Sequence, residues 1–232
     1  MLSTTRILYH REIKLLSTIL DWLFSARCVG CRARGAYLCD HCIERAPAAE
    51  AVPLPDTLAL FSYDYEPVKR AIWLLKYRGV RHLGQIFGPA VYERLLEPLA
   101  EVAALYPGDP PGGGWLAVPI PLSSARLRKR GFNQAEILAR ALVACDPITF
   151  TLAPMLLAKI THTPTQVSIK DRRTRLANLA GAFTVHDVSK VAGRNIILID
   201  DVITTGATMS EARRVLKQAG ARRILGVALA HG

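Results

Sequence analysis

The sequence has 232 residues, half of them hydrophobic, and it carries a formal net charge of +11. This length allows one α/β domain with a sizeable core and one small additional module. No uninterrupted apolar run approaches the roughly 20 residues that span a bilayer, which argues against a membrane-spanning protein. The positive charge suits partners that carry phosphate groups, including nucleic acids.

The N-terminus resembles a signal peptide, because three basic residues precede an apolar stretch over residues 15–24. Asp21 and Trp22 interrupt that stretch, and no small-residue cleavage site follows it. We therefore expect a cytoplasmic protein. The apolar residues of 15–24 fit one face of a helix that would pack beside the cysteine module or another subunit; a helix on a membrane surface is the weaker alternative.

Four cysteines form two Cys-x-x-Cys pairs, Cys28 with Cys31 and Cys39 with Cys42, separated by seven residues. Each pair can place two thiolates on one ion, so the pattern predicts a closed, structural tetrahedral zinc site. Two disulfides or inert thiols are the alternative, and a reducing compartment disfavours the disulfides. His41 is a substitute ligand. Cys145 ends an alanine-rich helical stretch and is interpreted as a core residue.

Proline and glycine clusters divide the chain. Residues 47–55 are interpreted as a linker, which separates an N-terminal helix and four-cysteine zinc-finger module (1–52) from the main domain (53–232). Within the main domain we expect a strand pair or hairpin edge over 57–65, helices over 67–77 and 83–104, a loop over 107–114 and a strand over 115–120.

A strongly basic segment follows that strand, with Arg126, Arg128, Lys129 and Arg130 in residues 121–135. Arginine offers bidentate contacts to phosphate oxygens, so Arg126 and Arg130 are candidates for binding a pyrophosphate. Basic loops are common on protein surfaces, and a solvated patch is the alternative.

A second basic, polar stretch covers residues 159–178. It is interpreted as a lid that closes over a phosphate site, with Lys159, Arg172, Arg173 and Arg175 as the contacts that complete the charge clamp. A plain exposed loop and helix explain the same composition equally well.

An unbroken apolar run, Ile196 to Ile199, predicts a buried parallel strand, and Asp200 and Asp201 follow it. Both aspartates can face one ligand only if the chain bends at Asp201, because side chains alternate along a strand.

A hydroxyl-rich turn then leads into a helix. Thr208 and Glu211 match a capping box, the apolar spacing continues to Gly220, and residues 224–229 form the next strand. The result is a βαβ unit whose helix N-terminus suits an anionic phosphate, while the carboxylates suit ribose hydroxyls.

Residues 197–208 resemble the phosphoribosyl pyrophosphate (PRPP) motif of type I phosphoribosyltransferases. The resemblance implies that Asp200 and Asp201 hold the ribose 2′- and 3′-hydroxyls. It also implies a 5′-phosphate cradle, made of Thr204, Thr205, Gly206, Ala207 and Thr208. The basic segment after residues 118–121 resembles the pyrophosphate loop of amidotransferase-type members.

Nearly the whole chain resembles the ComF family. The resemblance rests on the paired cysteines, the PRPP motif, and residues 75–79, 118–122, 130–134, 163–166 and 172–178. It implies a type I phosphoribosyltransferase fold, with a central mostly parallel sheet flanked by helices, joined to a small N-terminal zinc-finger module. It also implies PRPP with Mg²⁺, structural zinc, and a role in natural competence with single-stranded DNA and competence-machinery proteins as partners.

Three functional alternatives stay open beside PRPP binding in competence. An active phosphoribosyltransferase would move phosphoribosyl from PRPP to a nitrogen acceptor in nucleotide metabolism, yet no catalytic residue is identified, because none of the six histidines lies in the motif. A nucleic-acid-binding protein would use the positive charge, with Trp73, Tyr77 and Phe132 stacking on bases. A protein that uses PRPP as a signal would bind it without turnover.

Overall fold

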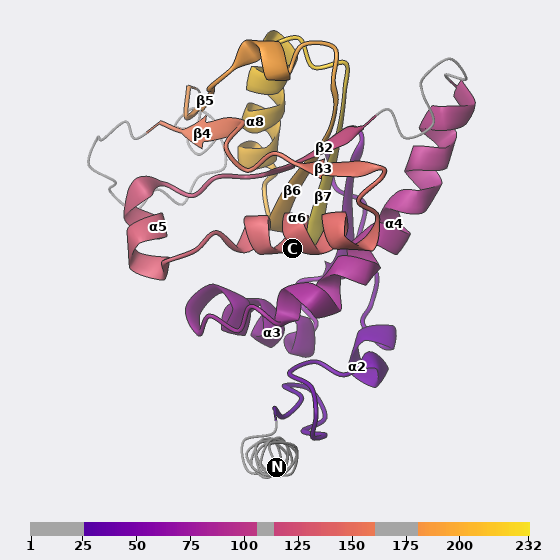
Figure 1. Ribbon diagram of the computed structural model, residues 1–232. Helices are drawn as coiled ribbons and strands as arrows, with labels where there is room; N and C mark the ends of the chain where they lie inside the picture. The colour runs from indigo at the N-terminus through magenta and orange to yellow at the C-terminus, as the bar shows by residue number, and fades with distance from the viewer. Residues whose placement is uncertain (1–25, 106–113, 161–180) are drawn as a thin grey trace, which may run out of the picture. The chain divides into compact units, whose positions relative to one another are not determined.

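A computed structural model describes residues 26–105, 114–160 and 181–232 (Figure 1). The chain divides into two compact units, Met1–Arg45 and Ala46–Gly232. The expected helix over residues 15–24, and Arg172, Arg173 and Arg175 of the expected lid, lie outside the described residues. None of the helices in the described ranges has both the length and the apolar character to cross a membrane.

The second unit is built on a five-stranded sheet in which every neighbouring pair is parallel. Across the sheet the strands are β1 (Thr57–Ser62), β7 (Arg223–His231), β6 (Asn195–Ile203), β2 (Trp115–Pro119) and β3 (Phe150–Leu152). A separate antiparallel pair joins β4 (Leu157–Lys159) to β5 (Phe183–Val185). The expected α/β class is therefore confirmed, and the central sheet is parallel throughout.

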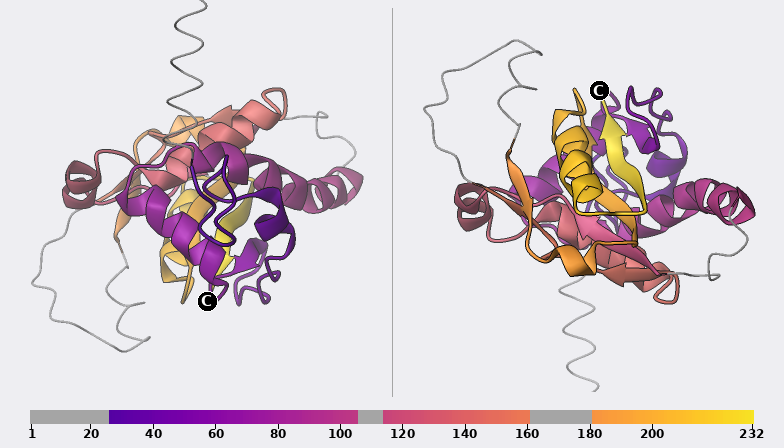
Figure 2. Two further views of the ribbon diagram at one scale, coloured as in Figure 1. Left: turned by 90° about the horizontal axis from the view of Figure 1, so that it is seen from below. Right: turned by 90° about the horizontal axis from the view of Figure 1, so that it is seen from above.

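Helices cover both faces of this sheet. The helices of the second unit are α3 (Glu66–Tyr77), α4 (Leu83–Leu105), α5 (Ser124–Arg130), α6 (Gln134–Cys145) and α8 (Ala207–Gln218), with the short 3₁₀ turn η1 (Val188–Lys190). Helix α6 packs on β2, β3 and β6 and against α4, whereas α8 packs on β5, β6 and β7. Figure 2 shows α8 and α4 on opposite sides of the strands.

Burial on both faces explains the sequence of β6. Its residues Asn195 to Ile199 are all buried, as a strand covered on two sides requires. Alternate residues Ile196 and Leu198 join the core formed with Met209, Ala212 and Leu216 of α8. The opposite face of the sheet is closed by α6 and α4.

The strand order creates a switch point between β2 and β6. After β2 the chain continues to β3 on one side, and after β6 it continues to β7 on the other. In open parallel sheets, ligands bind in the crevice beyond the carboxyl ends of such a strand pair. The basic segment that follows β2 and the aspartates of β6 meet at this crevice, since Ile120 donates its N–H to the Ile199 carbonyl at 2.8 Å.

Several local predictions are corrected. Residues 57–65 form no hairpin, because β1 is a single strand parallel to β7. The first residues of the expected linker are hydrogen-bonded to β1: the Ser62 N–H donates to the Pro47 carbonyl, and the Ala49 N–H donates to the Leu60 carbonyl. Cys145 is exposed at the end of α6, with its thiol directed to the Ala141 carbonyl, so its interpretation as a core residue is wrong.

The predicted capping box of Thr208 and Glu211 is also wrong. Helix α8 begins at Ala207, one residue before Thr208, and its N-cap Gly206 makes no side-chain hydrogen bond. Glu211 instead accepts from the Gly181 N–H at 2.7 Å and from the guanidinium of Arg214. Its carboxylate thus ties the described end of the segment before β5 to α8.

Candidate phosphate-binding cleft and metal centre

A cleft of about 790 Å³ opens at the switch point of the sheet. Five segments supply most of its lining: the end of α3 with the following turn (Lys76 to Gly79), the residues after β2 (Ile120 to Ser123), α5, Lys159 on β4, and Asp200 to Val202 of β6. Thr208 on α8 closes the edge. The cleft therefore gathers segments from most of the length of the second unit.

The lining is strongly cationic. Its basic side chains are Lys76, Arg78, Arg126, Lys129, Arg130 and Lys159, six in all, and its acidic ones are Asp200 and Asp201. A concave surface with this excess of one charge attracts a compact polyanion, and the arginines can bind phosphate oxygens in bidentate fashion. The two carboxylates form the one acidic spot among the described lining residues.

Asp201 is held by an ion pair with Lys76. The Lys76 Nζ lies 2.8 Å from Asp201 Oδ1, and the two side chains are only 19% and 5% exposed. The second oxygen, Asp201 Oδ2, is buried and has no hydrogen-bond partner among the described residues. A buried carboxylate oxygen without a donor is costly, so this atom points to a ligand that donates a hydrogen bond.

Asp200 is half-buried beside it and accepts the backbone N–H of Asp201 at 2.8 Å. Burial, helped by the charge of Asp201, raises the pKa of Asp200 to about 7, although Lys76 and Lys159 act in the opposite direction. Strand β6 continues through both aspartates to Ile203. Both aspartates nevertheless line the cleft, which opens across the end of the strand.

The turn before α8 adopts the conformation that its glycine permits. Gly206 has φ of 74°, a left-handed value that side-chain-bearing residues rarely adopt. Thr205 Oγ1 accepts the Ala207 N–H at 3.4 Å. Thr208 lines the cleft, whereas Thr204, Thr205, Gly206 and Ala207 are not among its lining residues. The first turn of α8 thus faces the cleft edge with its helix N-terminus.

Helix α5 carries the basic residues of the far wall. Ser123 caps it by accepting the Arg126 N–H, and Gly131, with φ of 78°, ends it. Arg126 and Arg130 both line the cleft, and Arg128 does not. Arg130 also donates to Gln134. The predicted pyrophosphate arginines are therefore placed in the same cleft as the aspartates.

Lys159 reaches the cleft from β4, with its ammonium 5.3 Å from the centre of the Phe183 ring. Burial lowers the pKa of Lys159; the charge of Arg126 lowers it further, and that of Asp200 raises it. This lysine therefore sits opposite Asp200, between cations and a carboxylate, at the base of the expected lid.

Aromatic rings extend from the cleft along α3. Tyr77 and Phe132 line the cleft, and the Trp73 and Tyr77 rings lie 5.8 Å apart with 50% and 63% of each residue exposed. Arg130 stands 5.2 Å over Tyr77, and Arg81 stands 5.1 Å over Phe132. We call Trp73, Tyr77 and Phe132 the aromatic platform; such exposed rings with guanidinium groups can stack on planar bases.

Lys76 lines the cleft and pairs with Asp201, and the sequence did not predict either position. It lies in the stretch 75–79, which contributed to the family resemblance but received no role. The stretch sits at the end of α3, more than 120 residues before Asp201, and no local spacing connects the two. The one sequence signal that could have indicated Lys76 was a basic residue in the last turn of an amphipathic helix.

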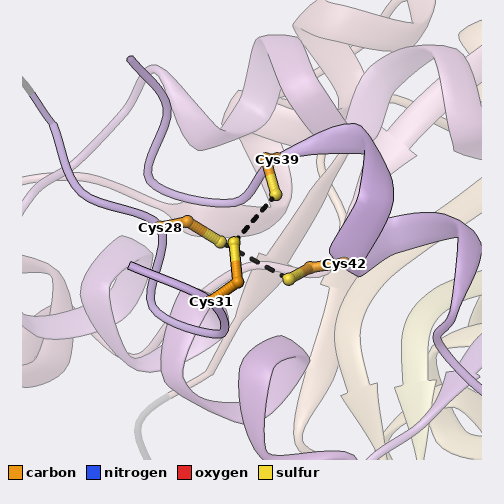
Figure 3. A group of neighbouring side chains, drawn as sticks. All are labelled: Cys28, Cys31, Cys39 and Cys42. Atoms are coloured by element: carbon orange, nitrogen blue, oxygen red, sulfur yellow. Dashed lines mark hydrogen bonds between the residues drawn. The ribbon is translucent and has the colours of Figure 1, made fainter. Parts of the chain in front are cut away.

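In the first unit the four cysteines converge (Figure 3). The sulfurs of Cys28, Cys31, Cys39 and Cys42 all lie within 4.8 Å of one another, with 3.6 Å between Cys28 and Cys42 and 3.5 Å between Cys31 and Cys39. A tetrahedral zinc with bonds of about 2.3 Å sets its sulfurs about 3.8 Å apart. The cluster fits zinc, and the exposed His41 is not part of it.

Two tight backbone arrangements build this cluster. Arg32, at a φ of 64°, donates its N–H to the Cys28 carbonyl and closes the first pair. Cys39 is the N-cap of α2 (Asp40–Glu44), which places Cys42 one turn along it. Burial and the neighbouring thiols raise the pKa of Cys42 to about 12. Four thiolates therefore need a cation to share the space, as a structural metal provides.

Comparison with known proteins places the second unit in a known family and finds relatives over most of the chain. The family described as phosphoribosyl transferase domain matches residues 127–231. Competence protein F of Haemophilus influenzae is 27% identical over 199 residues, 85% of this chain and 81% of that protein. Competence protein ComFC of Bacillus subtilis is 28% identical over 79% of this chain and 67% of that protein. DNA utilization protein YhgH of Salmonella typhi is 32% identical, over less than half of either chain.

Proposed function

The chain belongs to the ComF family, and from this we propose that it binds PRPP in the cleft and acts in natural competence. Single-stranded DNA and proteins of the competence machinery are its proposed partners, and the cytoplasm is its proposed location. The observation that carries the proposal is the meeting of six cations, two carboxylates and a helix N-terminus at one switch point.

The chemistry of PRPP matches this arrangement part by part. The ligand carries a 5′-phosphate at one end, a pyrophosphate at the other, and two ribose hydroxyls between them. The orphaned Asp201 Oδ2 and the Asp200 carboxylate would accept the hydroxyl hydrogens. Arg126, Arg130 and Lys159 would neutralise the pyrophosphate, and Arg172 and Arg175 would add to that clamp as lid residues.

The 5′-phosphate would lie against the N-terminus of α8. Thr204, Thr205, Gly206, Ala207 and Thr208 form the proposed cradle, in which backbone N–H groups and hydroxyls donate to phosphate oxygens. Of these five residues, only Thr208 is among the lining residues of the cleft. The proposal therefore requires the phosphate to sit at the edge of the cleft rather than in its centre.

Magnesium would accompany PRPP as the counter-ion of its pyrophosphate. Asp200 and Asp201 offer carboxylate oxygens, the ligand type that Mg²⁺ prefers. One of these oxygens, Asp201 Oδ1, already contacts the ammonium of Lys76. Zinc, in contrast, would be structural: the four-sulfur cluster leaves no open position at which a substrate could bind.

The aromatic platform supports single-stranded DNA as a partner. Trp73 and Tyr77 are exposed, Phe132 is partly buried, and arginines lie over the Tyr77 and Phe132 rings; unpaired bases stack on such surfaces while their phosphates bind the cations. A transfer reaction has less support, because no histidine is among the described lining residues of the cleft to serve as a general base.

Calorimetric titration of the protein with PRPP and Mg²⁺ tests the central claim. We expect saturable binding that Asp200→Asn combined with Asp201→Asn abolishes. Asp187→Asn is the matched control, because this partly exposed carboxyl caps η1 and lies outside the cleft lining, and an asparagine can keep the cap. Unchanged PRPP affinity in the double variant, with the fold intact by circular dichroism, contradicts the proposal. Release of pyrophosphate during the titration would identify a transfer reaction.

A further inference from the structure

The segment that leads into β1, residues 54–57, is attached to α8 at two points, and we call it the strap. At the first point Leu54 lies on Gly206, so closely that the glycine has no room for a side chain. At the second, Arg213 binds the strap from about two turns further along the helix. The strap therefore connects the turn before α8 to the body of that helix.

Arg213 holds the strap by its backbone. The guanidinium donates to the Pro55 carbonyl and, at 3.2 Å, to the Asp56 carbonyl. It also donates to the Ile224 carbonyl of β7, which ties the strap to the central sheet. The Asp56 carboxylate lies 3.5 Å from Arg213 Nη2 but is 65% exposed, so this ion pair contributes little stability. The Arg213 side chain is only 13% exposed, so its hydrogen bonds to the carbonyls are shielded from water and fix the strap.

The strap contains a backbone conformation that needs support. Asp56 has a φ of 46°, a left-handed value that is uncommon for residues with a side chain. Its carbonyl accepts from two donors, the Gly226 N–H at 2.8 Å and the Arg213 guanidinium. Such conformations persist where the surrounding structure fixes them. Removing the Arg213 side chain would therefore leave the Asp56 carbonyl with one of these two donors and the strap less firmly placed.

The strap packs on the part of the proposed phosphate cradle that lacks a side-chain cap. The N-cap of α8 is Gly206, which has no side chain to accept from the first N–H groups of the helix. The hydrogen bond from the Ala207 N–H to Thr205 Oγ1 is long, at 3.4 Å. Backbone N–H groups at a helix start bind a phosphate only when they point toward it. Because Leu54 restrains the Gly206 backbone from outside the turn, the strap influences where those N–H groups point.

We propose that Arg213 is a positioning residue for the 5′-phosphate of PRPP: it holds the strap, which keeps Leu54 on Gly206 and the N–H groups of the cradle directed at the phosphate. This rests on the proposed function, because it concerns how the same cradle, residues 204–208, is held. Arg213 is not among the lining residues of the cleft, so it acts through the strap and not on the ligand. The pyrophosphate end of the ligand, placed against α5, does not depend on the strap.

The test combines calorimetric titration of PRPP in Mg²⁺ with ³¹P NMR of the bound ligand, because the 5′-phosphate and the two pyrophosphate phosphorus atoms give separate resonances. Arg213→Met should weaken PRPP binding about tenfold, the value of one charge-assisted hydrogen bond. It should move the bound 5′-phosphate resonance toward its position in free PRPP and leave both pyrophosphate resonances at their wild-type bound positions. Arg213→Lys should fall between, since a lysine keeps the charge but lacks the fork that spans two carbonyls.

Lys217→Met is the control on the same helix, because Lys217 is exposed and lies outside the cleft lining. It should leave the PRPP affinity and all three resonances unchanged. If Arg213→Met fails to fold, Leu54→Ala keeps the arginine in place, removes the contact with Gly206, and should show the same selective change. A folded variant that keeps the wild-type affinity or the wild-type 5′-phosphate resonance, or that displaces all three resonances alike, overturns this inference alone. Wild-type protein that binds no PRPP overturns the proposed function as well.

Discussion

Leu54 packs directly on Gly206 at the start of α8. A Cβ added to Gly206 would lie 2.5 Å from Leu54 Cδ1 and 3.0 Å from Leu54 Cγ. The segment that precedes β1 thus covers the turn proposed to cradle the 5′-phosphate, and two positions more than 150 residues apart are in contact. Arg213 of α8 fixes the same segment, by donating to the carbonyls of Pro55 and Asp56.

Gly206→Ala should therefore destabilise the protein and weaken PRPP binding together. An alanine at φ of 74° costs about 1–2 kcal/mol, and displacing Leu54 adds about 1 kcal/mol. Urea denaturation and PRPP titration measure the two effects. Gly193→Ala is matched in backbone angle, with φ of 73° and open space around the new Cβ. Gly193→Ala should lose only the stability that the left-handed backbone angle costs an alanine, and it should bind PRPP normally. If both variants lose the same stability and affinity, the proposed role of Leu54 is contradicted.

The raised pKa of Asp200 predicts a pH-dependent penalty on stability. Between the ordinary value of 3.8 and about 7, the unfolded chain releases this proton while the folded protein retains it, so stability falls as pH rises through that window. Asp200→Asn removes the penalty. Thermal melts should place its Tm about 2–4 °C above wild type at pH 8, the shift for about 1 kcal/mol, and close to wild type at pH 4.5.

Glu211 provides a control of the opposite sign. The Arg214 guanidinium and the Gly181 N–H hold the pKa of Glu211 below its ordinary value. Its stabilising effect is present above the unfolded pKa and is lost as pH falls through the folded one. Glu211→Gln should therefore lower Tm at pH 7 and matter least in acid. If the changes in Tm of Asp200→Asn and Glu211→Gln followed the same dependence on pH, the opposite pKa shifts assigned to Asp200 and Glu211 would be refuted.

Zinc removal should disrupt the cysteine cluster. The sulfurs of Cys28 and Cys42 are 3.6 Å apart, and both residues are buried, so without a cation they repel as thiolates or stay protonated. We expect one zinc per chain by atomic emission, a lower Tm after chelation, and recovery on adding zinc back. Cys42→Ser should lose the metal. Cys145→Ser, at an exposed site on α6, should retain the zinc. If both variants lost zinc, the measured zinc per chain would reflect nonspecific binding to thiols.

The aromatic platform predicts a defined contribution to DNA binding. Trp73→Ala and Tyr77→Ala should each weaken binding of a fluorescent single-stranded oligonucleotide by about 1–3 kcal/mol, as loss of a stacked base does. The loss of binding free energy in each variant should be the same at every salt concentration, because stacking is not ionic. The affinity of the wild-type protein for the oligonucleotide, in contrast, should fall steeply as salt is raised. Leu105→Ala is the control, as an exposed apolar residue on α4. Unaltered binding in both platform variants would exclude the platform as the DNA site.

Part of the fold could be predicted because its signals are local. The run Ile196 to Ile199 is apolar on both sides of the strand, as burial under helices on both faces of the sheet requires. Helices over 66–77 and 83–105 differ from their predicted ranges by one residue at an end. The Cys-x-x-Cys spacing likewise predicted which four sulfurs meet. The capping box was predicted wrongly because a partner far along the chain, the Gly181 N–H, takes the Glu211 carboxylate.

The sequence by itself determined the chemical groups of this protein: four thiols at metal spacing, two adjacent carboxylates after a buried strand, a glycine turn before a helix, and clustered arginines. Their mutual positions were decided only by the tertiary structure. The parallel order β1-β7-β6-β2-β3 brings the segment after β2 beside Asp200, and the end of α3 places Lys76 against Asp201. The reason is physical: backbone periodicity is set by neighbouring residues, whereas ion pairs and clefts depend on packing between distant segments.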